Sequence, residues 1–412
     1  MCYERNGGNI YSITVFTEDE VIVAPLDELN TIIGCESTGA KEVSVKISVF
    51  IPVFRESKLL TKTLKTLTKQ EVRKEIFVVV DEPSEKCLKI LEGFERDVKV
   101  IINGKRVGKV KALNEAVKLS RGEILLFLDA DVEVPEDPKF LEKVIEEIKD
   151  ADFLDLNKEV IKDSFLSRMT YYEYVGFNMC SWFITRFVGK CPGVNGTAFA
   201  VKKCVFDSVK GFRRVVSEDL DIAFRAFLKS YRFKYTKKLK VYNHVHSSLE
   251  KWIRQRRRWA VGQALWLKEW RKELLRIGAK NPQVYAPALL FLFPSLMPLI
   301  FNILLPNSLV YNIAYLISLL VAVKFNLPLS FPILVLTTSS LDALKGILIS
   351  LTCFLIYAFL FFAFSAKLGF KFRPHEFFVY YFFYSPLNLL IAIAGLIRVF
   401  IFKEKSVSYW KV

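Results

Sequence analysis

The chain has 412 residues, of which 52% are hydrophobic and 25% charged, and its formal net charge at pH 7 is +16. Such a length suits two or three domains, and the composition excludes intrinsic disorder, a collagen-like repeat and a small disulfide scaffold. Nearly all the charge lies in residues 1–280, whereas residues 284–402 contain two acids, Asp342 and Glu376. We therefore expect a soluble-type domain followed by a membrane-type domain.

The cysteines and histidines are few and scattered: there are seven cysteines, without a C-x-x-C pair, and three histidines. This pattern argues against a disulfide framework and a zinc site, and it favours a reduced compartment. The basic excess could indicate nucleic acid, but bases gather in residues 251–280, just before the first apolar run. Such bases are typical of the cytoplasmic side of a membrane helix, and the first 45 residues show no secretory signal. We expect no nucleic-acid partner and a cytoplasmic N-terminal region.

Residues 1–44 are expected to form an N-terminal extension of short strands and turns. From residue 45 on, apolar strands alternate with helices, which predicts a mostly parallel sheet covered on both faces. The strands are expected at 45–54, 75–81, 98–102 and 123–129, and the first helices at 57–69 and 109–119. Ligands bind beyond the carboxyl ends of such strands. This rule places residues 52–56, 81–84 and 129–131 along one edge of the sheet.

The rest of the soluble part, which we bound at residues 45–248, is less regular. It shows a helix at 164–187, a glycine-rich turn at 193–196, a helix at 217–231 and a strand at 238–242. Residues 249–282 follow as a basic segment. Four tryptophans, Trp252, Trp259, Trp266 and Trp270, are interleaved with its bases. Over residues 249–277 this pattern predicts an amphipathic helix lying on the membrane surface.

Residues 283–403 are expected to form the membrane region. The apolar runs lie at 284–305, 308–323, 327–341, 346–366 and 377–402. A spanning helix needs about 20 residues, and two prolines in the third run suggest an interfacial or re-entrant segment. Basic residues lie in the tail, residues 404–412, and just before it, and they favour a cytoplasmic C-terminus. If both ends of the chain lie on the cytoplasmic side, the number of membrane crossings must be even, and we expect four.

Two acids, Asp129 and Asp131, end the fourth predicted strand. Side chains at i and i+2 of a strand point to the same side and would repel each other unless a cation lay between them. Mg²⁺ favours one or two carboxylates together with phosphate oxygens. The pair is therefore a candidate site for a metal bound to a nucleotide diphosphate, and the alternative is a solvated turn.

Three further groups of residues could contribute to chemistry. Glu218 and Asp219 follow Ser217, so they fit either a helix cap or a general base for a hydroxyl. Arg258 offers a fork suited to pyrophosphate and Trp259 a flat face suited to a sugar ring, although a basic helix could instead bind lipid headgroups. Lys109 follows a glycine-rich stretch that lacks the P-loop pattern, and it could meet an anion at a helix start.

Taken in order, these motifs resemble the inverting family 2 glycosyltransferases of the GT-A fold. The resemblance is strongest to the membrane-bound branch that contains cellulose, chitin, hyaluronan and poly-N-acetylglucosamine synthases, and it covers roughly residues 45–270. The motifs that carry it are Ile51, Pro52 and Glu56; Asp81; Gly108 and Lys109 with Ala112 and Asn114; Asp129 and Asp131; Gly196 and Thr197; Glu218 and Asp219; and Gln255, Arg258 and Trp259.

The resemblance implies a role for each matching residue. Asp219 would be the catalytic base, beside Glu218, and Asp129 and Asp131 would hold Mg²⁺ or Mn²⁺, with Asp131 favoured as the direct ligand. The donor-binding set would be Pro52, Glu56, Asp81, Lys109, Asp129 and Asp131, with Asp81 near a uracil base. Gln255, Arg258 and Trp259 would hold the pyrophosphate and the acceptor end.

The implied protein is an integral membrane enzyme, in the plasma membrane if prokaryotic, with a cytoplasmic catalytic domain. It would transfer a sugar with inversion from a nucleotide sugar, expected to be a UDP-hexose or UDP-N-acetylhexosamine, to a growing β-linked polysaccharide. The alternative is transfer of one sugar to a lipid carrier or glycolipid. Membrane lipids, and a second copy of the chain in a homo-oligomer, are the other expected partners.

Overall fold

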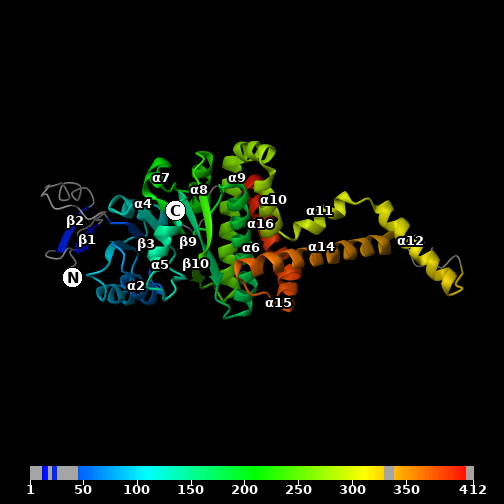
Figure 1. The fold of residues 1–412 in the computed structure, drawn as a ribbon, viewed down its shortest axis with the longest axis horizontal. Coiled ribbons are helices and arrows are strands. Elements are labelled where there is room, and N and C mark those ends of the chain that lie inside the picture. Colours follow the sequence, from blue (N-terminus) through cyan, green and yellow to red (C-terminus); the bar gives the residue numbers. More distant parts are fainter. Residues whose placement is uncertain (1–11, 17–20, 26–44, 329–337, 405–412) are drawn as a thin grey trace. The chain divides into compact units, whose positions relative to one another are not determined.

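A computed structural model describes residues 12–16, 21–25, 45–328 and 338–404 (Figure 1). The chain forms two compact units, which we call the sheet unit (1–285 with 391–412) and the helical unit (286–390). Most of the predicted extension 1–44, part of the apolar run 327–341 and nearly all of the tail 404–412 lie outside the described residues.

In the described residues, ten strands form one sheet in the order β2-β1-β5-β4-β3-β6-β9-β8-β10-β7. The strands are β1 Ser12–Phe16, β2 Val21–Pro25, β3 Ile47–Phe54, β4 Lys74–Asp81, β5 Lys99–Asn103, β6 Ile124–Leu128, β7 Val132–Glu133, β8 Phe153–Val160, β9 Ala198–Lys202 and β10 Phe233–Asn243. The predicted parallel core is confirmed, since β3 pairs in parallel with β4 and β6, and β4 with β5.

The remaining pairings are of both kinds, since β8 and β10 also pair in parallel. β9 runs antiparallel to both of its neighbours, β6 and β8, and β1, β2 and β7 also pair antiparallel. β8 and β9 escaped prediction because β8 carries polar residues that are nonetheless buried, and because β9 is only five residues long. The sheet is therefore mixed.

Eight helices of the described sheet unit lie between or after the strands (Figure 1). They are α2 Leu60–Thr68, α3 Glu85–Glu92, α4 Lys109–Lys118, α5 Phe140–Glu147, α6 Phe165–Val188, α7 Lys203–Ser208, α8 Glu218–Leu228 and α9 Leu249–Lys280. Aliphatic residues of β3, β4 and β6 pack on one face of the sheet. On the other face the rings of Phe50 and Phe127 stack with centroids 5.2 Å apart, and Phe127 lies 5.2 Å from Phe199. Burial on both faces explains the continuous apolar strands.

Three of the tryptophans of α9 pack against the protein, and the predicted position of this helix on the membrane surface stays a prediction. Trp252 is 1% exposed, and Trp266 and Trp270 pack against Phe224 of α8 with ring centroids 5.2 and 5.1 Å away. The tryptophan-bearing side therefore faces the protein. A helical pattern shows which residues share a side, but it does not show what that side contacts.

The helical unit contains fewer spanning candidates than the four crossings that we expected. In the described residues, two helices are long and apolar enough to cross a membrane: Leu341–Leu368 and Pro374–Phe400. The first lies within α14 (Thr338–Leu368). The second joins α15 (Pro374–Val379), the π-helix η1 (Tyr380–Tyr384) and α16 (Ser385–Phe400). The predicted run 284–305 is not straight, because α10 (Pro282–Leu292) and α11 (Leu296–Leu304) meet at 113° around Pro294 and count at most as a third span.

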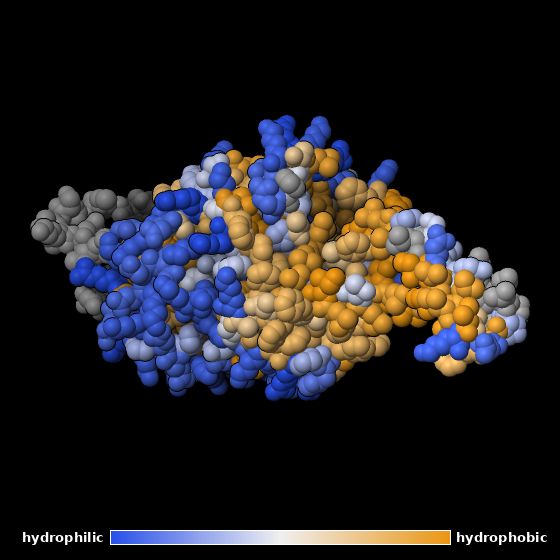
Figure 2. All heavy atoms as spheres, turned by 45° about the vertical axis from the view of Figure 1, so that its right-hand side comes forward, coloured by the Kyte–Doolittle hydropathy of each residue, from blue (hydrophilic) through white to orange (hydrophobic). Residues whose placement is uncertain are grey.

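The run 308–323 forms α12 (Asn307–Lys324), whose apolar part is shorter than a span. Residues 329–337 are outside the described residues, so the count of four remains a prediction. Hydrophobic atoms gather over the helices of the C-terminal part, whereas the sheet-bearing part is mainly hydrophilic on the face shown (Figure 2). This distribution is the one that a membrane-associated helical unit requires.

Candidate active site

The predicted edge of the sheet is confirmed. β3 and β4 end side by side, with Phe54 paired to Asp81, and Asp81 is paired in turn to Asn103 at the end of β5. Asp129 follows the last residue of β6, the parallel neighbour of β3 on its other side. The carboxyl ends of four parallel strands thus converge where a ligand is expected to bind.

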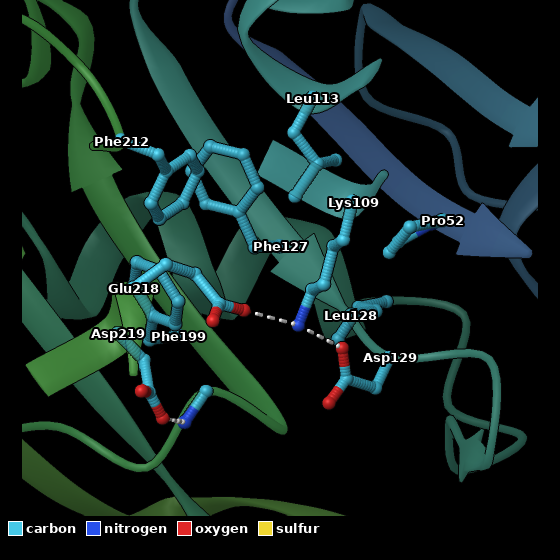
Figure 3. A pocket seen from close by; sticks show the side chains of 11 residues that line it. Pro52, Lys109, Leu113, Phe127, Leu128, Asp129, Phe199, Phe212, Glu218 and Asp219 are labelled. Atoms are coloured by element: carbon cyan, nitrogen blue, oxygen red, sulfur yellow. Dashed lines mark hydrogen bonds and ion pairs between the residues drawn. The ribbon is translucent and has the colours of Figure 1, made fainter. Parts of the chain in front are cut away.

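Lys109 lies between two acids at this edge (Figure 3). Its Nζ is 2.7 Å from Asp129 Oδ1 and 3.0 Å from Glu218 Oε1. Burial alone would lower the pKa of Lys109, but the charges of Asp129 and Glu218 outweigh it and hold that pKa above its usual value. The ammonium group of Lys109 therefore connects Asp129, which follows β6, with Glu218, which lies 89 positions further along the chain beside the predicted general base Asp219.

Asp131 carries a charge that its surroundings disfavour. Asp131 is exposed at the surface; the loss of part of its surrounding water and the charge of Asp129 raise its pKa to about 7, while Lys109 and Arg258 oppose the shift. A divalent cation beside the two carboxylates would relieve this repulsion, so the pair fits a metal. In the described residues no cluster of three or more His, Cys, Asp or Glu side chains could hold a metal. A metal here would therefore share its coordination with oxygens of the substrate or of water.

Asp219 is held by the turn before β9. Its Oδ2 accepts a hydrogen bond of 2.7 Å from Gly196 N, and its Oδ1 accepts one of 2.9 Å from Leu220 N. Burial raises the pKa of Asp219 to about 6, and the neighbouring charge of Glu218 adds to the shift, while Lys109 opposes it. The side chain of Ser217 makes no capping hydrogen bond to α8. The geometry thus favours the general-base interpretation of these acids over the cap.

Gly196 is required at its position by the close approach of Asp219. A Cβ on this residue would lie 2.8 Å from Asp219 Oδ2 and 2.9 Å from Asp219 Cβ. We expect Gly196→Ala to displace the carboxylate and to lower kcat by about 10²-fold, since misplacing a reacting group by an ångström has an effect of this order. Nucleotide-sugar turnover would measure the loss. Gly104→Ala is the matched control, because a Cβ there meets nothing within 4 Å; equal turnover in the two variants would contradict the prediction.

A buried ionic network anchors the helix that carries Glu218 and Asp219. Asp221 is 0% exposed, and its carboxylate accepts hydrogen bonds from Arg225 Nε (2.8 Å), Arg213 Nη1 (3.1 Å) and Trp270 Nε1 (3.3 Å). Arg213 also reaches Glu269 of α9 at 2.6 Å. Since Trp270 also belongs to α9, this network ties the start of α8 to α9 and thereby fixes where the predicted base lies.

The predicted motif of α9 lies near the acids in part. The guanidinium of Arg258 lies close enough to Asp131 for its charge to oppose the rise in the pKa of Asp131. An arginine that binds the pyrophosphate is expected to lie near the predicted metal ligands in this way. Trp259 is half-buried and lies under the guanidinium of Arg256, 4.3 Å from its ring centroid. Gln255 is also half-buried, and its predicted ligand contact stays a prediction.

The structure gives two predicted donor-binding residues contacts within the protein. Asp81 is 7% exposed; its Oδ2 accepts from Val107 N (3.1 Å) and Gly108 N (2.9 Å), and its Oδ1 accepts from Asn103 Nδ2 (2.9 Å). It therefore fastens the loop before α4, and direct contact with a base remains a prediction. Glu56 accepts a hydrogen bond from Ser84 Oγ at 3.3 Å.

One pocket brings together five of the predicted site residues, Pro52, Lys109, Asp129, Glu218 and Asp219 (Figure 3). Its lining combines acids and a base with three phenylalanines of the sheet core: Pro52, Lys109, Leu113, Phe127, Leu128, Asp129, Gly196, Phe199, Phe212, Glu218 and Asp219. Sequence reasoning missed Glu173 on α6, which pairs with Arg256 at 2.5 Å. A single acid in a long aromatic helix was its only signal.

The comparisons agree with this geometry. The mixed sheet with its helices is a GT-A-like fold: a solved mannosyltransferase from Pyrobaculum calidifontis, in complex with GDP-Man and Mn²⁺, matches with a TM-score of 0.52 and 16% identity over 88% of this chain and 89% of that one. Residues 48–220 match the family described as Glycosyl transferase family 2.

Two curated relatives are similar over part of the chain. Poly-beta-1,6-N-acetyl-D-glucosamine synthase of Staphylococcus epidermidis is 26% identical over 224 residues, which are 52% of this chain and 54% of that protein. Probable glucomannan 4-beta-mannosyltransferase 6 of Oryza sativa subsp. japonica is 29% identical over 168 residues, 37% of this chain and 27% of that protein. The chain thus spans about half the length of the staphylococcal synthase and less of the rice protein.

Proposed function

We propose that the protein is a membrane-bound inverting glycosyltransferase that moves a sugar from a nucleotide-sugar donor to a hydroxyl of a growing β-linked polysaccharide. The observation that carries the proposal is the junction at Lys109, which connects Asp129 with Glu218 beside Asp219. It joins a site suited to a diphosphate to a site suited to a base. The match of residues 48–220 to family 2 and the likeness to a polysaccharide synthase support the same assignment.

In this reaction Asp219 would act as the general base. Its two oxygens are oriented by backbone N–H groups of Gly196 and Leu220, and each keeps a lone pair for the proton of the acceptor hydroxyl. Lys109 and Arg258 would place positive charge where the departing diphosphate accumulates negative charge. An inverting transfer takes place in one displacement, so these residues need to form no covalent bond to the sugar.

Asp131 and Asp129 would hold Mg²⁺ or Mn²⁺. When bound, such an ion neutralises charge on the leaving diphosphate. The disfavoured charge of Asp131 supports this assignment, as does the Mn²⁺ in the solved mannosyltransferase. We expect activity to be lost on treatment with a chelator and to return with one of these ions.

The donor is expected to be a UDP-hexose or UDP-N-acetylhexosamine, by the resemblance to the polysaccharide synthases. The solved mannosyltransferase holds GDP-Man, so a guanosine donor belongs in the same screen. The acceptor can be tested separately. Transfer of a single sugar to a lipid carrier or glycolipid is the second candidate, and the apolar helices of the C-terminal part, which are typical of a protein in contact with lipid, favour it.

The domain boundaries at 45–248, 249–282 and 283–403 and the cytoplasmic position of the catalytic domain belong to the same proposal. The bases of α9, such as Arg271, Lys272 and Arg276, are exposed next to the first apolar helix, as on the inner side of a membrane. A homo-oligomer is also expected.

The test is a donor screen with the purified full-length chain in lipid nanodiscs. UDP or GDP release would be measured with Mg²⁺ and Mn²⁺ for each nucleotide sugar, and the products would be sized by mass spectrometry. A ladder of long chains identifies the polysaccharide synthase, and one added sugar on a lipid identifies the alternative. If no nucleotide sugar is bound or consumed, the proposed function is wrong.

The pH dependence of the rate follows from Asp219. Because the pKa of this carboxyl is raised to about 6, the base is ionised above that pH and protonated below it. We expect kcat to fall about tenfold for each pH unit below this value, as for any single essential base. Turnover at saturating donor would measure the profile, with circular dichroism at each pH as the control for folding. A flat profile through pH 6 in folded protein would contradict the assignment.

A further inference from the structure

A buried ion pair joins α6 to α9. Glu173 Oε2 lies 2.5 Å from Arg256 Nη2, and the two side chains are 6% and 2% exposed. Arg256 belongs to α9 and occupies a position between Gln255 and Arg258 to which the family motif assigns no role. A buried pair of this kind is costly to disrupt, because the remaining charge is left without its partner in a medium of low polarity.

Arg256 also contacts two tryptophan rings of the same helix. Its guanidinium carbon lies 4.3 Å from the ring centroid of Trp259 and 5.4 Å from that of Trp252. Both distances are within the range of a cation–π interaction, about 6 Å. Trp252 is 1% exposed and therefore fixed in the protein, whereas Trp259 is half-buried. The position of the guanidinium thus decides where the more open ring of Trp259 lies.

The next residue of α6 reaches the acidic side of the site. Tyr174 is 3% exposed, and its hydroxyl oxygen accepts a hydrogen bond of 2.8 Å from Asn243 Nδ2 at the end of β10. His244, which follows Asn243 in the chain, donates its backbone N–H to the backbone carbonyl oxygen of Asp131 at 3.0 Å. Adjacent residues of α6 therefore contact the helix with Trp259 and the strand end beside Asp131.

We infer that Glu173 is a positioning residue, which through Arg256 holds the indole of Trp259 in place for the acceptor end of the substrate. The inference rests on the proposed function only for the identity of what Trp259 binds. The coupling of Glu173 to the Trp259 ring is a property of the folded chain and can be measured without any turnover.

The first experiment measures the ring directly. The full chain is labelled with 5-fluorotryptophan in nanodiscs, and its ¹⁹F resonances are recorded; Trp259→Phe identifies the line of Trp259. Glu173→Gln keeps an acceptor of similar size but removes the charge, and we expect it to shift or broaden that line.

Asp155→Asn is the matched control. Asp155 forms a buried ion pair with Lys158, whose side chains are 8% and 2% exposed, and it accepts a hydrogen bond from Ser181 of α6. It thus resembles Glu173 in burial, charge and attachment to α6, but it is not joined to Arg256. We expect Asp155→Asn to leave the Trp259 line in place.

The second experiment separates acceptor from donor. Cellobiose and N,N′-diacetylchitobiose serve as acceptor probes, with the donor found in the screen. We expect Glu173→Gln to raise the acceptor KM about tenfold, on the scale of one buried cation–π contact, and to leave the donor KM unchanged. A larger share of donor hydrolysed to free sugar should accompany this change.

An unmoved Trp259 line in Glu173→Gln would overturn the inference, as would an equal shift in Asp155→Asn. If Glu173→Gln does not fold, the double variant Glu173→Leu/Arg256→Met, which leaves no buried charge, takes its place with the same expected line shift. A shifted line together with no reaction of any nucleotide sugar would uphold the inference and refute the proposed function, so the two can fail separately.

Discussion

Asp219→Asn is expected to reduce kcat by about 10²–10⁴-fold, the usual range for loss of a general base. The amide has nearly the same shape as the carboxylate, and its oxygen can still accept the hydrogen bond from Gly196 N that orients the wild-type side chain. The variant should therefore fold and bind donor while it loses the ability to take the acceptor proton. Single-turnover transfer at saturating donor would measure the loss.

The control for this prediction is donor affinity, measured by calorimetry with the nucleotide sugar that the screen identifies. Asp219→Asn should bind it with near wild-type affinity. Full activity in the variant would exclude Asp219 as the base, and Glu218, the adjacent acid that pairs with Lys109, would then be the candidate.

Asp221→Ala is expected to lower the free energy of unfolding of the sheet unit by about 3–5 kcal/mol, the cost of breaking a buried ionic network from one side. The carboxylate is 0% exposed and is bonded to Arg225 and Arg213, of which Arg225 is itself largely buried. Without it, that guanidinium keeps its hydrogen bonds to the carbonyl oxygens of Val209 and Gly211 but loses the negative charge beside it. Thermal unfolding followed by circular dichroism would show the change as a lower Tm.

Glu250→Ala is the matched control for this loss of an acid. Glu250 also pairs with an arginine four residues along its helix, Arg254, at 2.7 Å, but its side chain is exposed. An exposed pair of this type contributes about 0.3–0.5 kcal/mol, so the control should unfold close to wild type. Similar Tm values for the two variants would show that the network around Asp221 does not stabilise α8.

The parallel core and the site edge could be predicted because their signals are local. Continuous apolar strands imply burial on two faces, and in parallel strands the residues that follow the carboxyl ends must meet at one edge. Residues 52–56, 81–84 and 129–131 were therefore placed along one edge from sequence, and in the structure β3, β4 and β6 end there. Nothing beyond the order of strands and helices was needed for that step.

The strand β8 and the antiparallel insertion of β9 beside it could not be predicted, because their evidence is tertiary. β8 buries Asp155, Asn157 and Lys158, which the composition of a strand would place in solvent. Lys158 and Asp155 pair with each other, and Asp155 also accepts a hydrogen bond from Ser181 of α6. The inward-facing tryptophans likewise depend on neighbours that no periodicity reveals, whereas the bend in the run 284–305 has a local signal in Pro294.

The contacts of individual site residues were the least predictable part. The resemblance assigned Asp81 to a nucleobase, yet its carboxylate is occupied by the loop before α4. Glu173 had no motif at all, because its importance arises from a partner 83 positions away. Residue type and spacing identify which groups can perform chemistry, whereas the hydrogen-bond partners depend on the whole fold.

The position of β9 has a consequence for how the polypeptide is made. β9 inserts between β6 and β8, both of which leave the ribosome earlier. At about 5–20 residues per second, the nascent chain keeps the edge of β6 open for several seconds until residue 202 emerges. An uncovered strand edge invites pairing with other chains. We expect slowed translation between residues 128 and 202 to increase aggregation during synthesis, whereas a pause after residue 243, when every strand has emerged, should be harmless.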